Sequence, residues 1–349
     1  MRKRLAAALG LILTIGTAGC GLRMISPMSR IDRNTIPEMT ESNTPVHIDG
    51  EKLQFTVDAT IETPGDVRSA TLPYDPMLWR CCGLLFVVAD KAMGDCDRVF
   101  IDTGMVGGAA LCLVTPDIVA RRKLPTRWGL PYNSSKPVAL LGLAYVDRLN
   151  VGGLTIRRFQ AVIVDQGWQY RILGLPVWQS TYWCLGARFL RAAHFLRFDN
   201  AARKLTFEGK ESFAPDLTRR WVSYQFVMRD DDGAYLRLPV AGKEIEVLFD
   251  SGWGRKLTLS QADWDSIKSS VEVSSHAADK IFTWGGNETV DNYKVKNLPI
   301  GDTTLGNTII QVCSREQASV IGLAFFDDAV VVLDYEKSKL WIGTRRDTD

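Results

Sequence analysis

Short apolar runs separated by glycine, aspartate and asparagine dominate the pattern of hydrophobic and polar positions along this chain of 349 residues. The runs are rich in Val, Ile, Leu and Phe, and their length and punctuation predict β-strands. We expect strands over 83–89, 98–101, 161–164, 195–198 and 204–207 in the first half, and over 235–240, 244–249, 308–312, 330–333 and 340–342 in the second. Short helices are expected over 116–122, 188–193 and 261–269. The pattern therefore predicts a mainly β protein.

One tripeptide pattern occurs twice, each time directly after an apolar strand signal. Asp102-Thr103-Gly104 follows Val99-Phe100-Ile101, and Asp250-Ser251-Gly252 follows Val247-Leu248-Phe249. At ordinary residue frequencies a chain of this size contains Asp-[Ser/Thr]-Gly roughly 0.2 times by chance. Two copies in the same local context indicate a duplicated unit with one aspartate in each half.

Further landmarks recur in the same order after each tripeptide. Three pairs of segments align: 149–156 with 298–305, Cys184-Leu185-Gly186 with Val320-Ile321-Gly322, and 198–207 with 333–342. The first copy is longer, and its extra residues are most simply placed in the Trp- and Tyr-rich stretch 167–183. The expected organisation is a first lobe over 46–207, a linker over 208–220 and a second lobe over 221–349.

The N-terminus has the pattern of an export signal, with Arg2, Lys3 and Arg4 before the apolar run 5–15. That run is too short to span a membrane. Its ending, Thr17-Ala18-Gly19-Cys20, resembles the lipobox of bacterial lipoproteins. This resemblance implies a signal peptide over 1–19, acylation of Cys20 and a membrane-anchored protein of the cell envelope, on the periplasmic or extracellular face. An ordinary secretory signal is the alternative, and 20–45 is expected to be a tether.

Charge and metal-ligand content exclude several classes of function. Without the three basic residues of 1–19, the chain has 39 Lys and Arg against 40 Asp and Glu, so it is nearly neutral. No basic block predicts nucleic-acid binding, and the run Arg229-Asp230-Asp231-Asp232 is expected to be a solvated turn. With three histidines and no zinc-type cysteine spacing, we expect neither a metal nor a cofactor.

Six cysteines follow Cys20, an even number that permits three disulfides in an oxidising compartment. They are Cys81, Cys82, Cys96, Cys112, Cys184 and Cys313. Five of them lie in the first half, so bridges are expected mainly there. Cys313 is either a long-range partner or a buried thiol.

Over about 83–207 and 233–343, the repeated landmarks resemble the aspartic proteases of the pepsin and retropepsin type. In that family each lobe contributes one Asp-[Thr/Ser]-Gly and, later, two apolar residues and a glycine that thread beneath the catalytic loop. The resemblance implies a bilobal pepsin-like acid protease fold, with two homologous β-barrel-like lobes and the active-site cleft between them. It also implies a monomer whose substrate is an extended peptide or protein segment.

The resemblance assigns catalysis to Asp102 and Asp250, supported by Thr103, Gly104, Ser251 and Gly252. Two carboxylates a few ångströms apart cannot both ionise cheaply, so such a pair shares a proton. One carboxylate then activates a water while the other polarises or protonates the scissile carbonyl. The hydroxyls of the Thr and Ser are expected to bridge to backbone across the lobe interface.

The chain departs from the family at the residue after each tripeptide. Met105 and Trp253 stand where the family commonly has Ala or Ser, and these bulky residues are expected to narrow the substrate subsites or displace the loop. A catalytically inactive, peptide-binding lipoprotein is therefore the alternative function. A flap over the substrate is expected from 128–132 or 140–145 in the first lobe and from 282–287 in the second.

Two other hydrolase classes fit less well. A glycoside hydrolase also uses two carboxylates, and tryptophan stacks on sugars, but that chemistry does not need a duplicated Asp-[Ser/Thr]-Gly. A serine hydrolase would need a Gly-x-Ser-x-Gly elbow, and none is present. The sequence therefore favours an aspartic endopeptidase.

Overall fold

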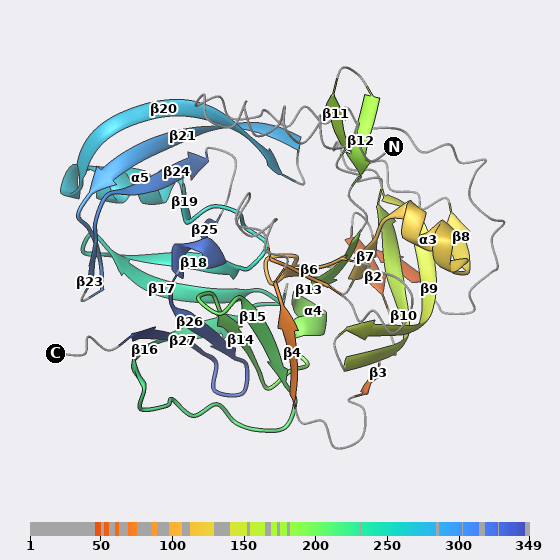
Figure 1. Cartoon of the computed structure of the whole chain (residues 1–349). Helices are drawn as coiled ribbons and strands as arrows, with labels where there is room; N and C mark the ends of the chain where they lie inside the picture. The colour runs from red at the N-terminus through yellow and green to blue at the C-terminus, as the bar shows by residue number, and fades with distance from the viewer. Residues whose placement is uncertain are drawn as a thin grey trace, which may run out of the picture. The chain divides into compact units, whose positions relative to one another are not determined.

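The fold is described from a computed structural model (Figure 1). The structure describes residues 46–49, 52–55, 60–62, 69–74, 85–88, 98–106, 112–128, 140–151, 154–164, 169–172, 175–179, 182–230, 232–283, 286–301, 303–313, 318–326 and 328–345. The predicted signal peptide 1–19, Cys20, the tether 20–45 and Cys81, Cys82 and Cys96 lie outside these residues. Within them, none of the helices has both the length and the apolar character that a membrane span requires.

The first half of the chain forms a mixed sheet of parallel and antiparallel strands, in the order β5-β6-β13-β7-β10-β9-β8. Its strands are β5 (Phe86–Val88), β6 (Arg98–Asp102), β13 (Tyr182–Gly186), β7 (Cys112–Val114), β10 (Leu154–Val164), β9 (Leu140–Val151) and β8 (Thr126–Trp128). The central strand β13 runs parallel to β6 and antiparallel to β7. A short strand, β3 (Thr60–Glu62), pairs with β10, and β1 (Val46–Asp49) pairs with β2 (Lys52–Phe55) in a separate hairpin.

The second half repeats this sheet in the order β17-β18-β25-β19-β24-β21-β20. These strands are β17 (Ala234–Val240), β18 (Lys243–Asp250), β25 (Ser319–Gly322), β19 (Leu257–Ser260), β24 (Thr308–Cys313), β21 (Gly286–Lys296) and β20 (Glu272–Thr283). The central strand β25 again runs parallel to one neighbour, β18, and antiparallel to the other, β19. Two short strands, β22 (Leu298–Ile300) and β23 (Thr303–Leu305), extend this half from β17.

A third set of strands joins the two halves, in the order β4-β15-β14-β26-β27-β16. The first half supplies β4 (Ser69–Pro73), β15 (Lys204–Glu208) and β14 (Phe195–Asp199), and the second supplies β26 (Val330–Asp334), β27 (Lys339–Arg345) and β16 (Arg219–Met228). At the centre β14 and β26 run antiparallel, with Arg197 opposite Val332. The two halves therefore meet as equivalent three-stranded ladders, as expected for a duplicated chain.

The hydrophobic core is continuous through this junction. Phe249 at the end of β18 lies with its ring centroid 6.0 Å from that of Phe198 in β14 and 6.5 Å from that of Phe326. All three side chains are buried. These matched sheets, with a shared core and a shared ladder, confirm the predicted mainly β, bilobal pepsin-like fold.

The helices lie close to their predicted positions. They are α3 (Pro116–Arg122), α4 (Ala187–Leu190) and α5 (Gln261–Ile267), followed by the short 3-10 turns η3 (Lys268–Ser270) and, after β25, η4 (Leu323–Phe326). Proline at the start of α3 and the Ser260 side chain, which accepts a hydrogen bond from the Asp263 amide at 3.1 Å, explain why two of them begin where they do. The helix expected over 188–193 is shorter, since α4 ends at Leu190.

Three details differ from the sequence-based expectations. The long strands β9, β16, β20 and β21 were not predicted, because polar residues interrupt their apolar pattern. The predicted insertion 167–183 contains the hairpin of β11 (Gln169–Ile172) and β12 (Leu175–Gln179), which belongs to a separate compact unit. However, Trp183 is fully buried in the central strand β13, so it belongs to the duplicated sheet.

Three cysteines lie within the described residues, and all three are buried. Cys112 and Cys184 are buried free thiols, so the three disulfides that the even number of cysteines would permit do not all form. Cys313 packs near Val290 and Trp253.

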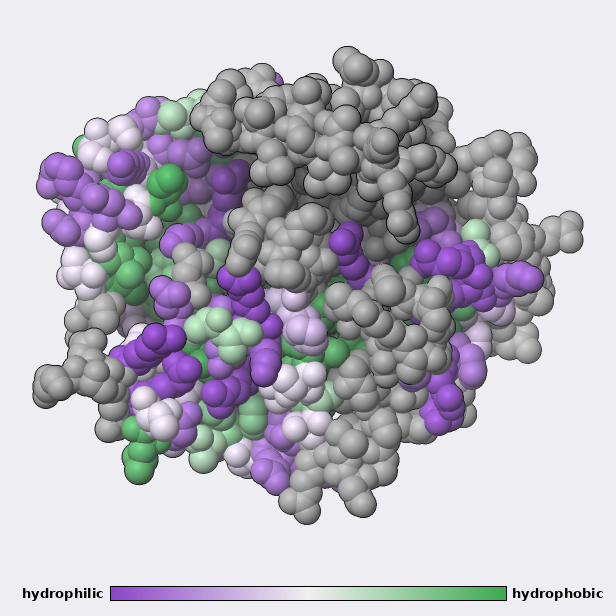
Figure 2. All heavy atoms as spheres, viewed as in Figure 1, coloured by the Kyte–Doolittle hydropathy of each residue, from purple (hydrophilic) through white to green (hydrophobic). Residues whose placement is uncertain are grey.

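On the described part of the face in Figure 2, hydrophilic residues lie between the hydrophobic ones, and the exposed large apolar side chains are scattered along the chain.

Candidate active site

The two aspartates lie at equivalent strand ends. Asp102 ends β6 in register with Gly186 of the central strand, and Asp250 ends β18 in register with Gly322. A Cβ added to Gly322 would lie 2.0 Å from the carbonyl oxygen of Arg255. Only a glycine leaves room for the loop to cross the central strand at this point. The predicted threading of the Gly-containing strand beneath the Asp-Ser-Gly loop is therefore present in the structure.

The two loops hold each other through reciprocal hydrogen bonds. The Thr103 Oγ1 accepts from the Ser251 amide at 2.8 Å and donates to the Phe249 carbonyl at 3.0 Å. The Ser251 Oγ accepts from the Thr103 amide at 3.1 Å and donates to the Ile101 carbonyl at 2.8 Å. Both side chains are buried. The hydroxyls predicted to bridge the lobes thus occupy the bridging positions, and they fix one aspartate relative to the other.

Each carboxylate accepts a hydrogen bond from its own loop and lies against the glycine of the opposite loop. The Gly104 amide donates to Asp102 Oδ1 at 3.1 Å, and the Gly252 amide donates to Asp250 Oδ1 at 2.7 Å. A Cβ added to Gly104 would lie 2.1 Å from the Asp250 Cγ, and one on Gly252 would lie 2.6 Å from the Asp102 Cγ. The third residue of each tripeptide must therefore be glycine to let the carboxyl groups approach.

The two carboxyl groups lie next to each other, and each affects the titration of the other. Burial raises the pKa of Asp102 well above its usual value, and the neighbouring charge of Asp250 raises it further. Burial also raises the pKa of Asp250, but its interaction with the Asp102 carboxyl group opposes that rise. Since such a pair titrates as a unit, the arrangement favours one shared proton, and the deeper burial of Asp102 favours Asp102 as its holder.

Two sulfur-containing side chains line the Asp102 side of the pair. The Cys184 Sγ lies 4.0 Å from Asp102 Oδ2 and 3.6 Å from the Met105 Sδ. Burial raises the pKa of the Cys184 thiol well above its usual value, which keeps it neutral beside the carboxyl group. Met105 is itself buried, and its amide donates to the Asp102 carbonyl at 3.3 Å, so it packs into the loop without displacing it. Sequence reasoning used Cys184 only as a landmark, although its place two residues before Gly186 gives it the same face as that glycine.

Trp253 occupies the corresponding position on the Asp250 side. Its amide donates to the Asp250 carbonyl at 3.2 Å. Its indole N–H donates to the Thr258 Oγ1 at 2.8 Å, and the side chain packs against Val290 and Cys313. The ring thus contacts residues of β19, β21 and β24. The loop around Asp250 makes the same amide–carbonyl hydrogen bond as the loop around Asp102.

The flap predictions have mixed outcomes. Residues 140–145 lie within β9, paired on both sides by β8 and β10, so this stretch is a sheet strand rather than a free hairpin tip. Of the alternative 128–132, only Trp128 lies within the described residues. In the second half, Phe282 pairs with Asn287 where β20 turns into β21, so a hairpin is present there. Residues 284 and 285 at its turn lie outside the described residues.

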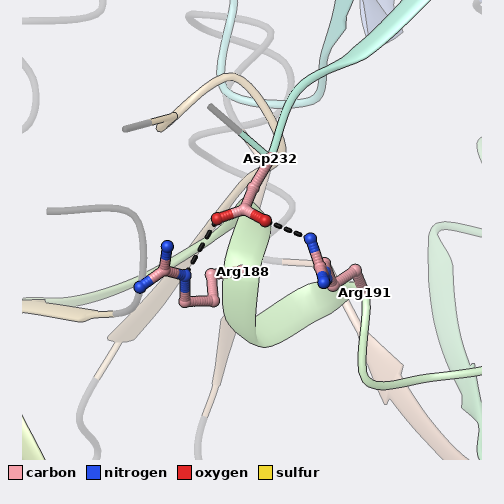
Figure 3. Close-up of polar contacts among 3 residues, drawn as sticks. All are labelled: Arg188, Arg191 and Asp232. Carbon is pink, nitrogen blue, oxygen red and sulfur yellow. Dashed lines mark hydrogen bonds and ion pairs between the residues drawn. The ribbon is translucent and has the colours of Figure 1, made fainter. Parts of the chain in front are cut away.

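Near the site, a carboxylate of the second half is held between two arginines of the first (Figure 3). Asp232, in the turn between β16 and β17, lies 2.9 Å from the Nε of Arg188 and also pairs with Arg191, both carried by or next to α4. The Asp232 side chain is 6% exposed. The expected solvated turn over 229–232 is therefore wrong for this residue, because the helix that follows Gly186 covers it.

Comparisons with known proteins give distant structural similarities only. No protein-family model and no curated protein sequence matches the chain. The chain is similar to the crystal structure of basic 7S globulin from soybean, at 11% identity and a TM-score of 0.43, over 82% of this chain and 95% of that one. It is also similar to conglutin gamma, a basic 7S globulin from lupine seeds, at 10% identity and a TM-score of 0.44, over 80% and 95%. A retropepsin-like aspartic protease from Rickettsia conorii matches at 13% identity and a TM-score of 0.27, over 37% of this chain and 95% of that one.

Proposed function

We propose that this protein is an aspartic endopeptidase that hydrolyses peptide bonds with Asp102 and Asp250. The observation that carries the proposal is the pair of adjacent carboxyl groups, the buried Asp102 and the partly buried Asp250, held at the ends of two equivalent strands. A pair of carboxyl groups with one shared proton has both an acid and a base available at the same pH, which amide hydrolysis needs. No cofactor is required for this chemistry.

The proposed reaction uses the proton asymmetry of the pair. Asp250, as the carboxylate, takes a proton from a water held between the two groups, and the water oxygen bonds to the carbonyl carbon of the scissile peptide. Asp102 gives its proton to the carbonyl oxygen, so the intermediate is a neutral gem-diol. When the gem-diol collapses, the C–N bond breaks and the leaving amine takes the proton from Asp250. Asp102 takes a proton from one gem-diol hydroxyl, so the pair again holds one proton and the other product is a carboxylic acid. The acid role is given to Asp102 because its carboxyl group is the more deeply buried of the two.

The proposed substrate is a peptide or protein segment in an extended conformation, and we propose that the protein acts on it as a monomer.

We also propose that the protein is a lipoprotein anchored to a membrane of the cell envelope through Cys20. The support is the lipobox-like sequence before that cysteine. A Cys20→Ala variant is expected to move from the membrane fraction to the soluble fraction, and its retention in the membrane fraction would overturn the lipid-anchor proposal.

Peptide-library cleavage by the mature protein tests the proposed activity. The protein, purified in detergent, is incubated with the library from acid to neutral pH, with and without a statine-type inhibitor that mimics the gem-diol. Cleavage that the inhibitor blocks supports the proposal. Binding of extended peptides without cleavage at any pH would instead identify a catalytically inactive, peptide-binding protein.

A further inference from the structure

A row of polar side chains crosses the second-half sheet beside the Asp250 loop. Thr258 of β19 is in register with Gln311 of β24, which is in register with Asn292 of β21, so the three side chains share one face. The Thr258 hydroxyl donates to Gln311 Oε1 at 3.3 Å, and the Gln311 Nε2 donates to Asn292 Oδ1 at 3.2 Å. Thr258 and Gln311 are buried. The row is thus a continuous hydrogen-bonded chain within the sheet.

The row ends on the loop that carries Asp250. The Trp253 indole N–H donates to the Thr258 Oγ1 at 2.8 Å, while the Trp253 amide donates to the Asp250 carbonyl at 3.2 Å. One residue therefore connects the backbone of Asp250 to the sheet. Because Thr258 accepts from Trp253 and donates to Gln311, its single hydroxyl is the link between the loop and the rest of the row.

The equivalent positions in the first half are apolar. Leu113 of β7 is in register with Val162 of β10, which is in register with Leu143 of β9, and all three are buried. The loop residue at the matching position is Met105, which has no N–H in its side chain. The first half therefore has an apolar loop residue over an apolar row, and the second has an indole donor over a polar row.

This matched difference indicates that the polar row and Trp253 act together. A buried polar side chain is tolerated only where its hydrogen bonds are made, and the first half shows that this position of the fold can be filled by apolar residues. A row that served packing alone would not need an indole donor at one end and an amide at the other. The hydrogen-bonded arrangement instead adds a directional restraint to the loop, which apolar contacts do not supply.

We propose that Trp253 and Thr258, backed by Gln311 and Asn292, are positioning residues that hold the Asp250 carboxylate in its reactive place. The inference rests on the proposed endopeptidase function, since it assigns these residues a role at the same site. The second-half loop is held by the sheet through a hydrogen bond, whereas the first-half loop is held beside Asp102 by the packing of Met105 on Cys184.

The test removes either the Thr258 hydroxyl or the Trp253 indole N–H, the two groups that link the row to the loop. Thr258→Val keeps the shape of the side chain, Thr258→Ser keeps the hydroxyl, and Trp253→Phe keeps an aromatic ring without the N–H. We expect Thr258→Val and Trp253→Phe each to lower kcat by about tenfold with KM little changed, because a misplaced carboxylate weakens the transition state more than substrate binding. Thr258→Ser is expected to retain most of the activity, and the double variant to be no slower than the slower single variant.

A matched control removes a hydroxyl far from the loop. Thr206→Val loses a contact with the Thr71 hydroxyl in the ladder that joins the halves, and it is expected to leave kcat unchanged. Wild-type activity in Thr258→Val, or an equal loss in Thr258→Ser, would overturn the positioning role. An additive double variant would overturn the link between the two residues.

Amide hydrogen exchange separates this inference from the proposed function. In Thr258→Val, and not in Thr258→Ser, the amides of 251–254 are expected to exchange faster, whether or not the protein cleaves peptides. A wild-type protein without peptidase activity would contradict the proposed function, and the exchange result would then still decide whether the row restrains the loop. Unchanged exchange in Thr258→Val would overturn the inference even if the wild type is active.

Discussion

The hydroxyl of Thr103 accepts a hydrogen bond from the Ser251 amide at 2.8 Å, and the hydroxyl of Ser251 accepts one from the Thr103 amide at 3.1 Å. These residues lie 148 positions apart in the sequence, and each directly follows one aspartate of the pair. Since both hydroxyls also donate to backbone carbonyls, four hydrogen bonds fix the two loops to each other. This reciprocal contact determines how far apart the carboxyl groups are held.

Replacement of Thr103 by Val should destabilise the protein. It leaves the buried Ser251 amide without its acceptor and the Phe249 carbonyl without its donor. We expect a loss of about 2–4 kcal/mol in the free energy of unfolding, since each unsatisfied buried group costs about 1–3 kcal/mol. Urea unfolding measures the change. Thr103→Ser, which keeps the hydroxyl, should lose clearly less, and equal losses in the two variants would contradict the bridging role.

Replacement of Gly104 by Ala should abolish the proposed activity. The new Cβ would lie 2.1 Å from the Asp250 Cγ, so the carboxyl groups must move apart. We expect kcat/KM to fall by about 100-fold or more, since a displacement of this kind at reacting groups carries such a cost. Gly306→Ala is the matched control, because nothing lies within 4 Å of its added Cβ. Similar activity in both variants would show that the close approach of the carboxyl groups is not needed.

The raised pKa of Asp102 predicts a specific dependence of stability on pH. A carboxyl group whose pKa is higher in the folded state binds its proton more tightly there, so stability falls as pH rises from about 4, the unfolded value, through the folded pKa. Asp102→Asn removes this dependence. Relative to the wild type, the variant should therefore gain stability as pH is raised from 4 to neutrality, as measured by urea unfolding at each pH.

The control for this experiment is a surface aspartate with the opposite shift. The hydrogen bond from Lys268 lowers the pKa of the exposed Asp265, so its contribution to stability is present above about pH 4 and is lost as pH falls. Relative to the wild type, Asp265→Asn should not gain stability toward neutral pH. Parallel curves for wild type and Asp102→Asn would contradict the raised pKa of Asp102.

Asp232 should stabilise the contact between the two halves. Its backbone has a left-handed φ of 69°, which Asn adopts as readily as Asp, so Asp232→Asn removes the charge without backbone strain. We expect a loss of about 1–2 kcal/mol, limited by the partial exposure of Arg188 and Arg191, and a melting temperature lower by a few degrees. The difference from the wild type should shrink at high salt.

The exposed Asp230 in the same turn provides the comparison for that variant. Asp230→Asn is expected to leave the melting temperature nearly unchanged. If the two variants behave alike, Asp232 does not hold the halves together in the way that its ion pairs indicate.

Local patterns in the sequence predicted the short apolar strands and the loops that follow them. The apolar runs predicted a mainly β chain, and the repeated landmarks around Asp102 and Asp250 carried the family resemblance that implied the bilobal fold and the residues that meet at the site. The long strands β20 and β21 were missed because their residues alternate weakly and many are polar. A strand with one exposed face and polar cross-strand pairs is stabilised by its neighbouring strands, so its own sequence pattern does not reveal it.

Contacts across the sheet could not be predicted in the same way. The hydrogen bond from Trp253 to Thr258 and the burial of Asp232 depend on which strand or helix lies alongside, and neither follows from residue spacing. Trp253 was expected to crowd the catalytic loop, and Asp232 to be solvated. In both residues the polar group meets a partner from another element, and this partner determines its role.

The most direct test of the proposed catalytic pair is cleavage of a fluorogenic peptide, chosen from the library experiment, by Asp102→Asn and Asp250→Asn beside the wild type and the surface control Asp265→Asn. If the two carboxyl groups share one proton and act on one water, each single variant should lose at least about 1,000-fold in kcat/KM, and Asp265→Asn should lose nothing. Both variants should remain folded. Substantial activity in either active-site variant would show that the pair does not form the catalytic centre.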